Sequence, residues 1–204
     1  MRTDAASNRS ALLEAAEAAF AEHGLDVSLN EIARRAGVGN ATLYRHFRDR
    51  SALVAELFER QLRRYCTLAK EAADAPDPAT AFREAITATA ALQASNRALA
   101  GLLVSLQPVS PAVDELRDRH YAAIRTVVER AVAAGAVHGD VTPADVAVLL
   151  IANEGLIRRA ADDAPGASAR LVALWLEGVG AHAPDEPLPA PPTEEQMAQV
   201  LSRS

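Results

Sequence analysis

Two short helical patterns follow one another closely between Ser28 and Phe47. The first begins with a reciprocal cap, in which the Ser28 hydroxyl can accept from the Glu31 amide while the Glu31 side chain reaches back. It stops at Gly37, and the second begins at Asn40. Two helices joined by so short a glycine-containing turn cross steeply, so the segment predicts a helix-turn-helix.

The rest of the chain carries apolar residues at helical spacing and no strand-like alternation. Alanine dominates, while β-branched and aromatic residues are sparse, which favours helix over strand. The chain is therefore predicted to be all-α, with about nine helices and a possible short terminal one. The expected helices span about residues 8–23, 28–36, 40–46, 49–73, 79–94, 96–107, 111–134, 143–161 and 168–182, with the terminal one at 193–203.

Three regions are expected along the chain. Residues 1–50 would form a three-helix helix-turn-helix domain, and residues 51–182 a larger helical domain. Residues 183–204 would form a tail, because five of the ten residues in 183–192 are proline.

The charge is distributed unevenly. The net charge is −6, but residues 1–65 carry ten basic and nine acidic side chains, whereas the remaining 139 carry eleven and eighteen. Within residues 32–50, five arginines face only Asp49, which gives a local charge of +4. Binding to phosphates requires a local positive surface rather than a basic whole, so only the N-terminal quarter suits DNA.

Several other classes lack their sequence signals. No apolar run is long enough to span a membrane, and the N-terminus lacks an apolar signal core, so we expect a cytoplasmic protein. There is no glycine-rich phosphate loop, nucleophile elbow or metal-ligand cluster, so we expect no enzyme activity, cofactor or metal. The single cysteine, Cys66, fits either a packed core residue or a redox sensor beside basic residues.

The second helix of the motif offers side chains suited to DNA. Leu43 and Phe47 lie four residues apart and can pack back on the domain, which leaves the polar residues facing outward. Arg45 can read guanine or hold only a phosphate, and Asn40 can pair with adenine or hold a phosphate. The candidate DNA contacts are Ser28, Asn40, Ala41, Thr42, Tyr44, Arg45, His46 and Arg50.

The run from Ile32 to Phe47 resembles the DNA-binding signature of the tetracycline-repressor (TetR) family, and the likeness covers about residues 8–58. The Thr-Leu-Tyr-x-His-Phe run at residues 42–47 is its most specific part. At Asn40-Ala41 the chain departs from the family, which often has Lys or Arg, or an apolar residue followed by Gly.

This resemblance implies an all-helical homodimer that binds double-stranded operator DNA, usually as a repressor, and releases it when a small-molecule effector binds the larger domain. The implied pocket residues are Leu62, Tyr65, Phe82, Ile86, Thr89, Leu103, Gln107, Tyr121, Ile124 and Asn153. The implied dimer-interface residues are Val146, Leu149, Leu150, Leu171, Leu174, Trp175 and Gly178. The alternative is a helical module that binds small molecules and has weak or no affinity for DNA.

Overall fold

The computed structural model describes residues 2–24, 26–101, 103–104, 109–160, 164, 166–180 and 188–202. The regular elements in these ranges are all α-helices, apart from an isolated bridge between Val137 and Gly180. The helices are α1 (Arg2–His23), α2 (Leu29–Arg35), α3 (Asn40–His46), α4 (Arg50–Asp74), α5 (Pro78–Ser95), α6 (Arg97–Ala100), α7 (Pro111–Ala133), α8 (Pro143–Ala160), α9 (Ala167–Gly178) and α10 (Glu194–Leu201). The predicted all-α class is confirmed.

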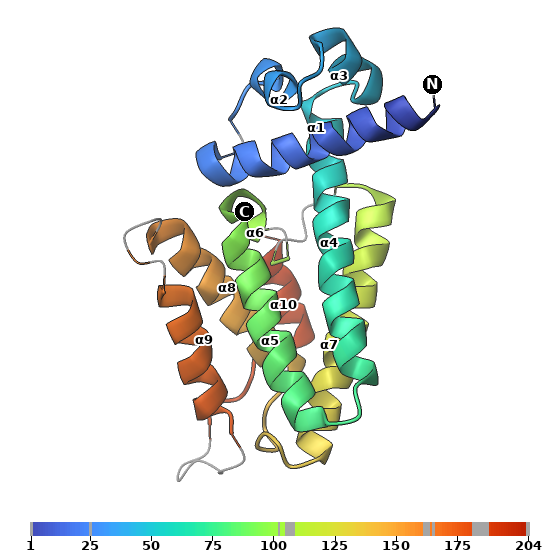
Figure 1. Cartoon of the computed structure of the whole chain (residues 1–204). Helices are drawn as coiled ribbons and strands as arrows, with labels where there is room; N and C mark the ends of the chain where they lie inside the picture. The colour runs from blue at the N-terminus through green and yellow to red at the C-terminus, as the bar shows by residue number, and fades with distance from the viewer. Residues whose placement is uncertain are drawn as a thin grey trace.

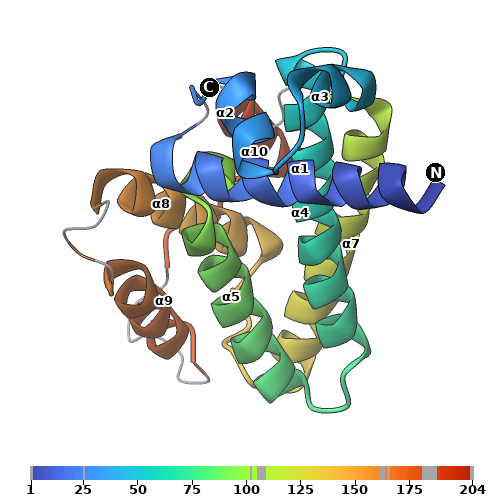
Figure 2. The same cartoon turned by 45° about the horizontal axis from the view of Figure 1, so that its top comes forward.

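A small head formed by α1, α2 and α3 lies at one end of the molecule (Figures 1 and 2). Its core consists of fully buried side chains, among them Phe20, Ile32 and Leu43. Leu53 and Leu57 from the first turns of α4 belong to the same core, so the head extends past residue 50.

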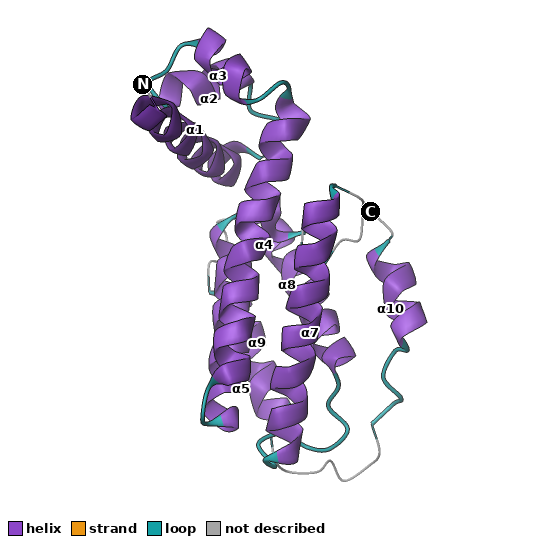
Figure 3. Ribbon diagram, turned by 90° about the vertical axis from the view of Figure 1, so that its right-hand side faces the viewer, coloured by secondary structure: helices purple, strands orange, loops and turns teal. Residues whose placement is uncertain are grey.

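Helix α4 runs from the head into the body of the molecule, as Figure 3 shows. Its start is fixed by Asp49, whose Oδ1 accepts a hydrogen bond from the Ala52 amide at 2.8 Å. Further along the same helix, Leu62, Tyr65 and Ala69 are buried in the body. One continuous helix therefore connects the two cores mechanically.

The body is a bundle in which α5, α7, α8 and α9 surround the largest core. Both α5 and α7 begin with a side-chain cap followed by proline: Asp77 precedes Pro78, and Ser110 precedes Pro111. A proline at the first helical position lacks only an N–H that would have had no partner in the helix. These local signals explain why the predicted starts of both helices lie within one residue of the observed ones.

The bounds of α1 and α6 depart furthest from expectation. α1 begins at Arg2 instead of about residue 8, and α6 ends at Ala100 instead of about residue 107. Leu99 of α6 is buried in the head core, so this single turn contacts the head. In the tail, α10 lies beside the body, near α7 and α8 (Figure 3).

Candidate DNA-binding surface and effector cavity

The turn between α2 and α3 is formed by a glycine in the left-handed region. Gly37 has a φ of 69°, which a residue with a Cβ rarely adopts. The Gly37 amide donates to the Arg34 carbonyl at 3.2 Å, and the Val38 amide donates to the Ala33 carbonyl at 3.0 Å. This paired pattern ends α2 and redirects the chain into α3 at once.

Two apolar side chains anchor α3 to the head. Leu43 and Phe47 are 1% and 2% exposed and belong to the head core. The Arg9 guanidinium of α1 lies 5.0 Å from the Phe47 ring centroid, and Arg9 also pairs with Glu56 of α4. The middle and the C-terminal end of α3 are thus held, which fixes the direction in which its remaining side chains point.

The opposite side of α3 faces solvent. Asn40, Ala41 and Arg45 are exposed, and Tyr44 is 52% exposed although it is a large aromatic residue. Thr42 and His46 are half-buried at the edge of this surface, and the His46 ring lies 6.5 Å from that of Phe47. The structure therefore brings six of the predicted contacts onto one helix, in an orientation that would let α3 enter a major groove.

The positive charge of this end is smaller than the sequence count suggests. Glu31 accepts from Arg34 at 2.7 Å and from Arg35 at 2.9 Å, and Arg35 also pairs with Glu22 at 2.7 Å. The Arg34 and Arg35 hydrogen bonds lower the pKa of Glu31 to about 2. Glu22 and Glu31 lie outside residues 32–50, so the local count of +4 left out both partners.

Two other predicted contacts have roles inside the head. The Ser28 hydroxyl accepts from the Glu31 amide at 3.2 Å, which is one half of the predicted reciprocal cap, whereas the Glu31 carboxylate binds Arg34 and Arg35. The Arg50 guanidinium donates to the Val27 carbonyl, which ties the start of α4 to the chain before α2. On α3, Arg45 contacts only the Ala41 carbonyl, at 3.3 Å, and forms no ion pair with any described residue.

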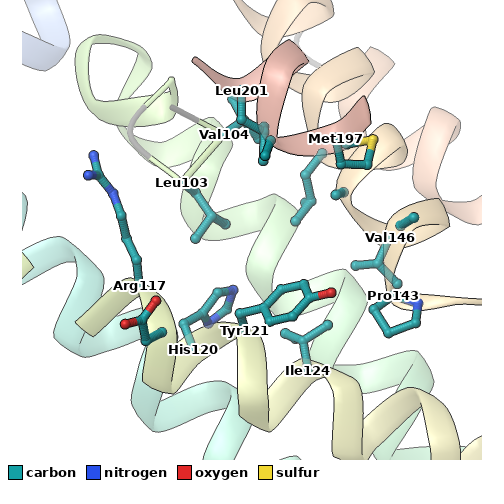
Figure 4. A pocket seen from close by; sticks show the side chains of 15 residues that line it. Leu103, Val104, Arg117, His120, Tyr121, Ile124, Pro143, Val146, Met197 and Leu201 are labelled. Atoms are coloured by element: carbon teal, nitrogen blue, oxygen red, sulfur yellow. The ribbon is translucent and has the colours of Figure 1, made fainter. Parts of the chain in front are cut away.

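A cavity of about 310 Å³ lies in the body between α7, α8 and α10 (Figure 4). Its lining is mostly apolar, with Arg117, Asp118, His120 and Tyr121 as its titratable side chains. Three predicted pocket residues, Leu103, Tyr121 and Ile124, line it. The remaining lining residues are Val104, Pro143, Ala144, Val146, Ala147, Leu150, Met197, Ala198 and Leu201.

Other predicted pocket residues lie elsewhere. These side chains are buried in the cores without lining the cavity, and they are Leu62, Tyr65, Phe82, Ile86, Thr89 and Asn153. Gln107 lies outside the described residues. Met197 and Leu201 were not predicted to line a pocket. Their four-residue spacing after the Thr193–Gln196 cap nevertheless places them on one face of a short helix.

The predicted interface residues divide into two groups. Val146, Leu149 and Leu150 are 1%, 3% and 4% exposed, buried within a single protomer, because the inward side of α8 carries them. These three side chains therefore expose almost no area that a second subunit could contact. On α9, by contrast, Leu174 is 53% exposed, Gly178 is exposed, and Leu171 and Trp175 are half-buried. Val148, at 45%, adds an exposed apolar residue on α8.

Cys66 is half-buried, and its thiol contacts the Leu116 carbonyl at 3.2 Å. Burial raises the pKa of the Cys66 thiol, while Arg119 and Arg63 act in the opposite direction. A thiol with a raised pKa holds little thiolate near neutral pH, so this environment favours the packed-residue interpretation over the redox sensor.

Two further features of the described residues concern membrane insertion and metal binding. Among them, no helix combines the length and apolarity needed to cross a membrane. No group of three or more His, Cys, Asp or Glu side chains gathers there as a metal site.

An all-helical head with a capped helix, a glycine turn and an outward-facing second helix defines a helix-turn-helix DNA-binding protein. Residues 12–57 match the model for "Bacterial regulatory proteins, tetR family", and residues 77–181 match "Transcriptional regulator SbtR-like, C-terminal domain". The chain belongs to the TetR family of transcriptional regulators. The predicted family and regulatory function are thereby confirmed.

Solved structures support the assignment over nearly the whole chain. A TetR regulator from Mycobacterium vanbaalenii is 32% identical with a TM-score of 0.63, covering 88% of this chain and 98% of that one. A TetR regulator from Streptomyces coelicolor is 29% identical with a TM-score of 0.63, covering 86% and 99%. An HTH-type regulator of Staphylococcus aureus is 41% identical over 75 residues, which are 36% of this chain and 40% of that relative. The chain thus matches less than half the length of these curated relatives.

Proposed function

We propose that this protein is a ligand-responsive repressor that binds operator DNA as a homodimer and releases it when a small molecule occupies the α7–α8 cavity. The observation that carries the DNA-binding part is the exposed face of α3. Tyr44 and Arg45 point away from a helix whose other side is fixed by Leu43 and Phe47. Arg45 suits a guanine edge or a phosphate, while Thr42, Tyr44 and His46 have donors suited to phosphate oxygens.

The homodimer is supported by the apolar surface of α8 and α9. Val148 and Leu174 are about half exposed, and Gly178 would let a second helix approach closely. Such a patch on a pair of helices suits a four-helix contact between two copies. Two reading heads must lie about 34–36 Å apart to meet successive major grooves, so the dimer sets the operator spacing.

Release by an effector is supported by contacts that join the body to the head. Gln93 of α5 donates to the Ala100 carbonyl of α6 at 3.1 Å and to the Leu150 carbonyl of α8 at 3.1 Å. Leu150 lines the cavity, and Leu99, the neighbour of Ala100, is packed in the head core. A ligand that moves α8 would therefore shift the head and change the population of DNA-competent dimers.

The proposal predicts binding to DNA and its reversal in one assay. Fluorescence anisotropy with duplexes from upstream of the protein's own gene should show saturable binding at moderate salt, because cytoplasmic regulators of this kind often act near their genes. Adding the effector should lower the affinity at least tenfold. Flat titrations across all duplexes would contradict the DNA-binding part, whereas tight binding that no cavity ligand weakens would contradict only the release mechanism.

A further inference from the structure

Helix α10 lies beyond residue 181, where the match to the C-terminal family model ends. It has its own start signal: the Thr193 hydroxyl accepts from the Gln196 amide at 3.2 Å, and the Gln196 side chain accepts from the Thr193 amide at 2.9 Å. A capping box of this kind supplies partners for two amides at the start of a helix. The start of α10 is therefore encoded locally, outside the residues that match the family model.

One face of α10 covers the cavity. Met197 is only 8% exposed and Leu201 is half-buried, and both line the cavity with Ala198, whereas Val200 on the same helix is 45% exposed. In Figure 4 the Met197 and Leu201 side chains lie across the cavity from His120, Tyr121 and Ile124 of α7. Among the described residues, none from α10 belongs to the three buried core clusters. The helix thus contacts the body at the rim of the cavity and stays outside the cores.

The floor of the cavity has a polar end. His120 is 8% exposed, and its Nδ1 atom has no hydrogen-bond partner among the described residues. A neutral imidazole can donate or accept at that nitrogen. Arg117 lies one helical turn earlier and pairs with Asp114 at 3.0 Å, and Asp118 is exposed on the same helix. A hydrogen-bonding oxygen group fits this end of the cavity.

We propose that α10 is a lid over this cavity, which closes on a small, mainly apolar molecule carrying one hydrogen-bonding oxygen group. Met197 and Leu201 form the apolar roof, and His120 receives the oxygen group below. The proposal rests on the effector-binding part of the proposed function and specifies how that site is covered. A cavity near 300 Å³ lies at the lower end of the range for drug-sized ligands, so the molecule it takes is small.

The test uses the full chain and Nile red, an uncharged apolar dye with a carbonyl oxygen. Met197→Glu and Leu201→Glu place a carboxylate under the lid, whereas Val200→Glu adds the same charge on its exposed side and is the matched control. Both lid variants should bind the dye about tenfold more weakly and release it about tenfold faster, with unfolding midpoints near that of the wild type. Val200→Glu should match the wild type in both.

Each of the following outcomes would contradict the proposal that α10 is a lid. Equal dye affinity and release in all variants would mean that α10 does not cover the site, and tighter binding by the lid variants would make α10 a competitor instead. A fall of many degrees in the unfolding midpoint would make α10 part of the core. Ala147→Trp, which places an indole in the cavity, should abolish dye binding, and persistence would place the dye elsewhere. None of these measurements involves DNA, so they test the lid even if the protein does not bind DNA.

Discussion

Asn96, between α5 and α6, donates a hydrogen bond from Nδ2 to the main-chain carbonyl of Glu17 in α1, at 3.2 Å. Asn96 is only 3% exposed, so this bond joins the body to the head without competition from water. The Glu17 carboxylate also pairs with Arg64 of α4. Glu17 of α1 is thus held both by the α5–α6 junction and by α4, so it ties the head to the body.

Loss of the Asn96 amide should weaken this junction. Asn96→Ala is expected to lower the free energy of unfolding by about 1–2 kcal/mol, because it removes a hydrogen bond and the packing of a side chain that is only 3% exposed. Ser95→Ala is the matched control, since Ser95 is exposed and bonds only within its own turn, to the Leu92 carbonyl. Urea denaturation measures both variants, and a change below about 0.5 kcal/mol for Asn96→Ala would show that the junction contributes little.

The exposed residues of α3 should separate affinity from sequence preference. Tyr44→Phe and His46→Ala should weaken binding to all duplexes by a similar factor, about tenfold for a donor lost from a charged phosphate. Arg45→Ala should instead relax preference at one base pair by about 1–3 kcal/mol if Arg45 reads guanine. Anisotropy titrations against a panel of single-base variants distinguish these results. A changed site preference in Tyr44→Phe would contradict its assignment to phosphate.

The exposed face of α9 should be required for self-association. Leu174→Glu places a charge in the centre of the proposed interface and is expected to yield monomers at micromolar concentration. Ala122→Glu, on an exposed position of α7, is the control and should leave the dimer intact. Sedimentation velocity reports the masses directly, and an intact Leu174→Glu dimer would refute this interface.

His120 should make stability depend on pH. Burial lowers the pKa of His120 to about 4, with an opposing contribution from the Tyr65 backbone. In an unfolded chain the histidine has a pKa near 6.5. Between pH 6.5 and pH 4 the unfolded chain therefore binds a proton at this residue, whereas the folded chain does not. The free energy of unfolding should therefore fall as the pH decreases from about 6.5 to about 4, by up to about 1.4 kcal/mol per pH unit from this residue.

The comparison that isolates His120 is with His120→Phe, which keeps an aromatic ring near Tyr65 but cannot titrate. The difference in unfolding free energy between the two proteins, measured by urea titration at several pH values, should change through this window and level off below it. Parallel curves from pH 7 to pH 4 would show that His120 titrates normally.

The sequence was most informative where the signals are local. The cap at Ser28, the stop at Gly37 and the Leu43–Phe47 spacing predicted α2 and α3 almost to the residue. These features depend on neighbours within four positions, so no knowledge of the tertiary fold is needed to interpret them.

Features that depend on distant segments could not be derived in this way. Helix α8 is apolar on nearly every side, so periodicity alone did not show that Val146 faces the core and Val148 faces solvent. Arg35 pairs with Glu22, 13 positions earlier and on another helix. The cavity itself requires α10, which returns to α7 and α8 from the end of the chain.

The most direct test of the account is selection of bound sequences from a random duplex library by the full-length protein at about physiological salt. The account predicts enrichment of a two-fold symmetric site whose half-sites lie about one helical turn apart, about 34–36 Å, or a multiple of it. A Tyr44→Phe/His46→Ala protein should enrich the same site more weakly. No enriched sequence, or a single site without symmetry, would contradict the reading of operator DNA by paired α3 helices.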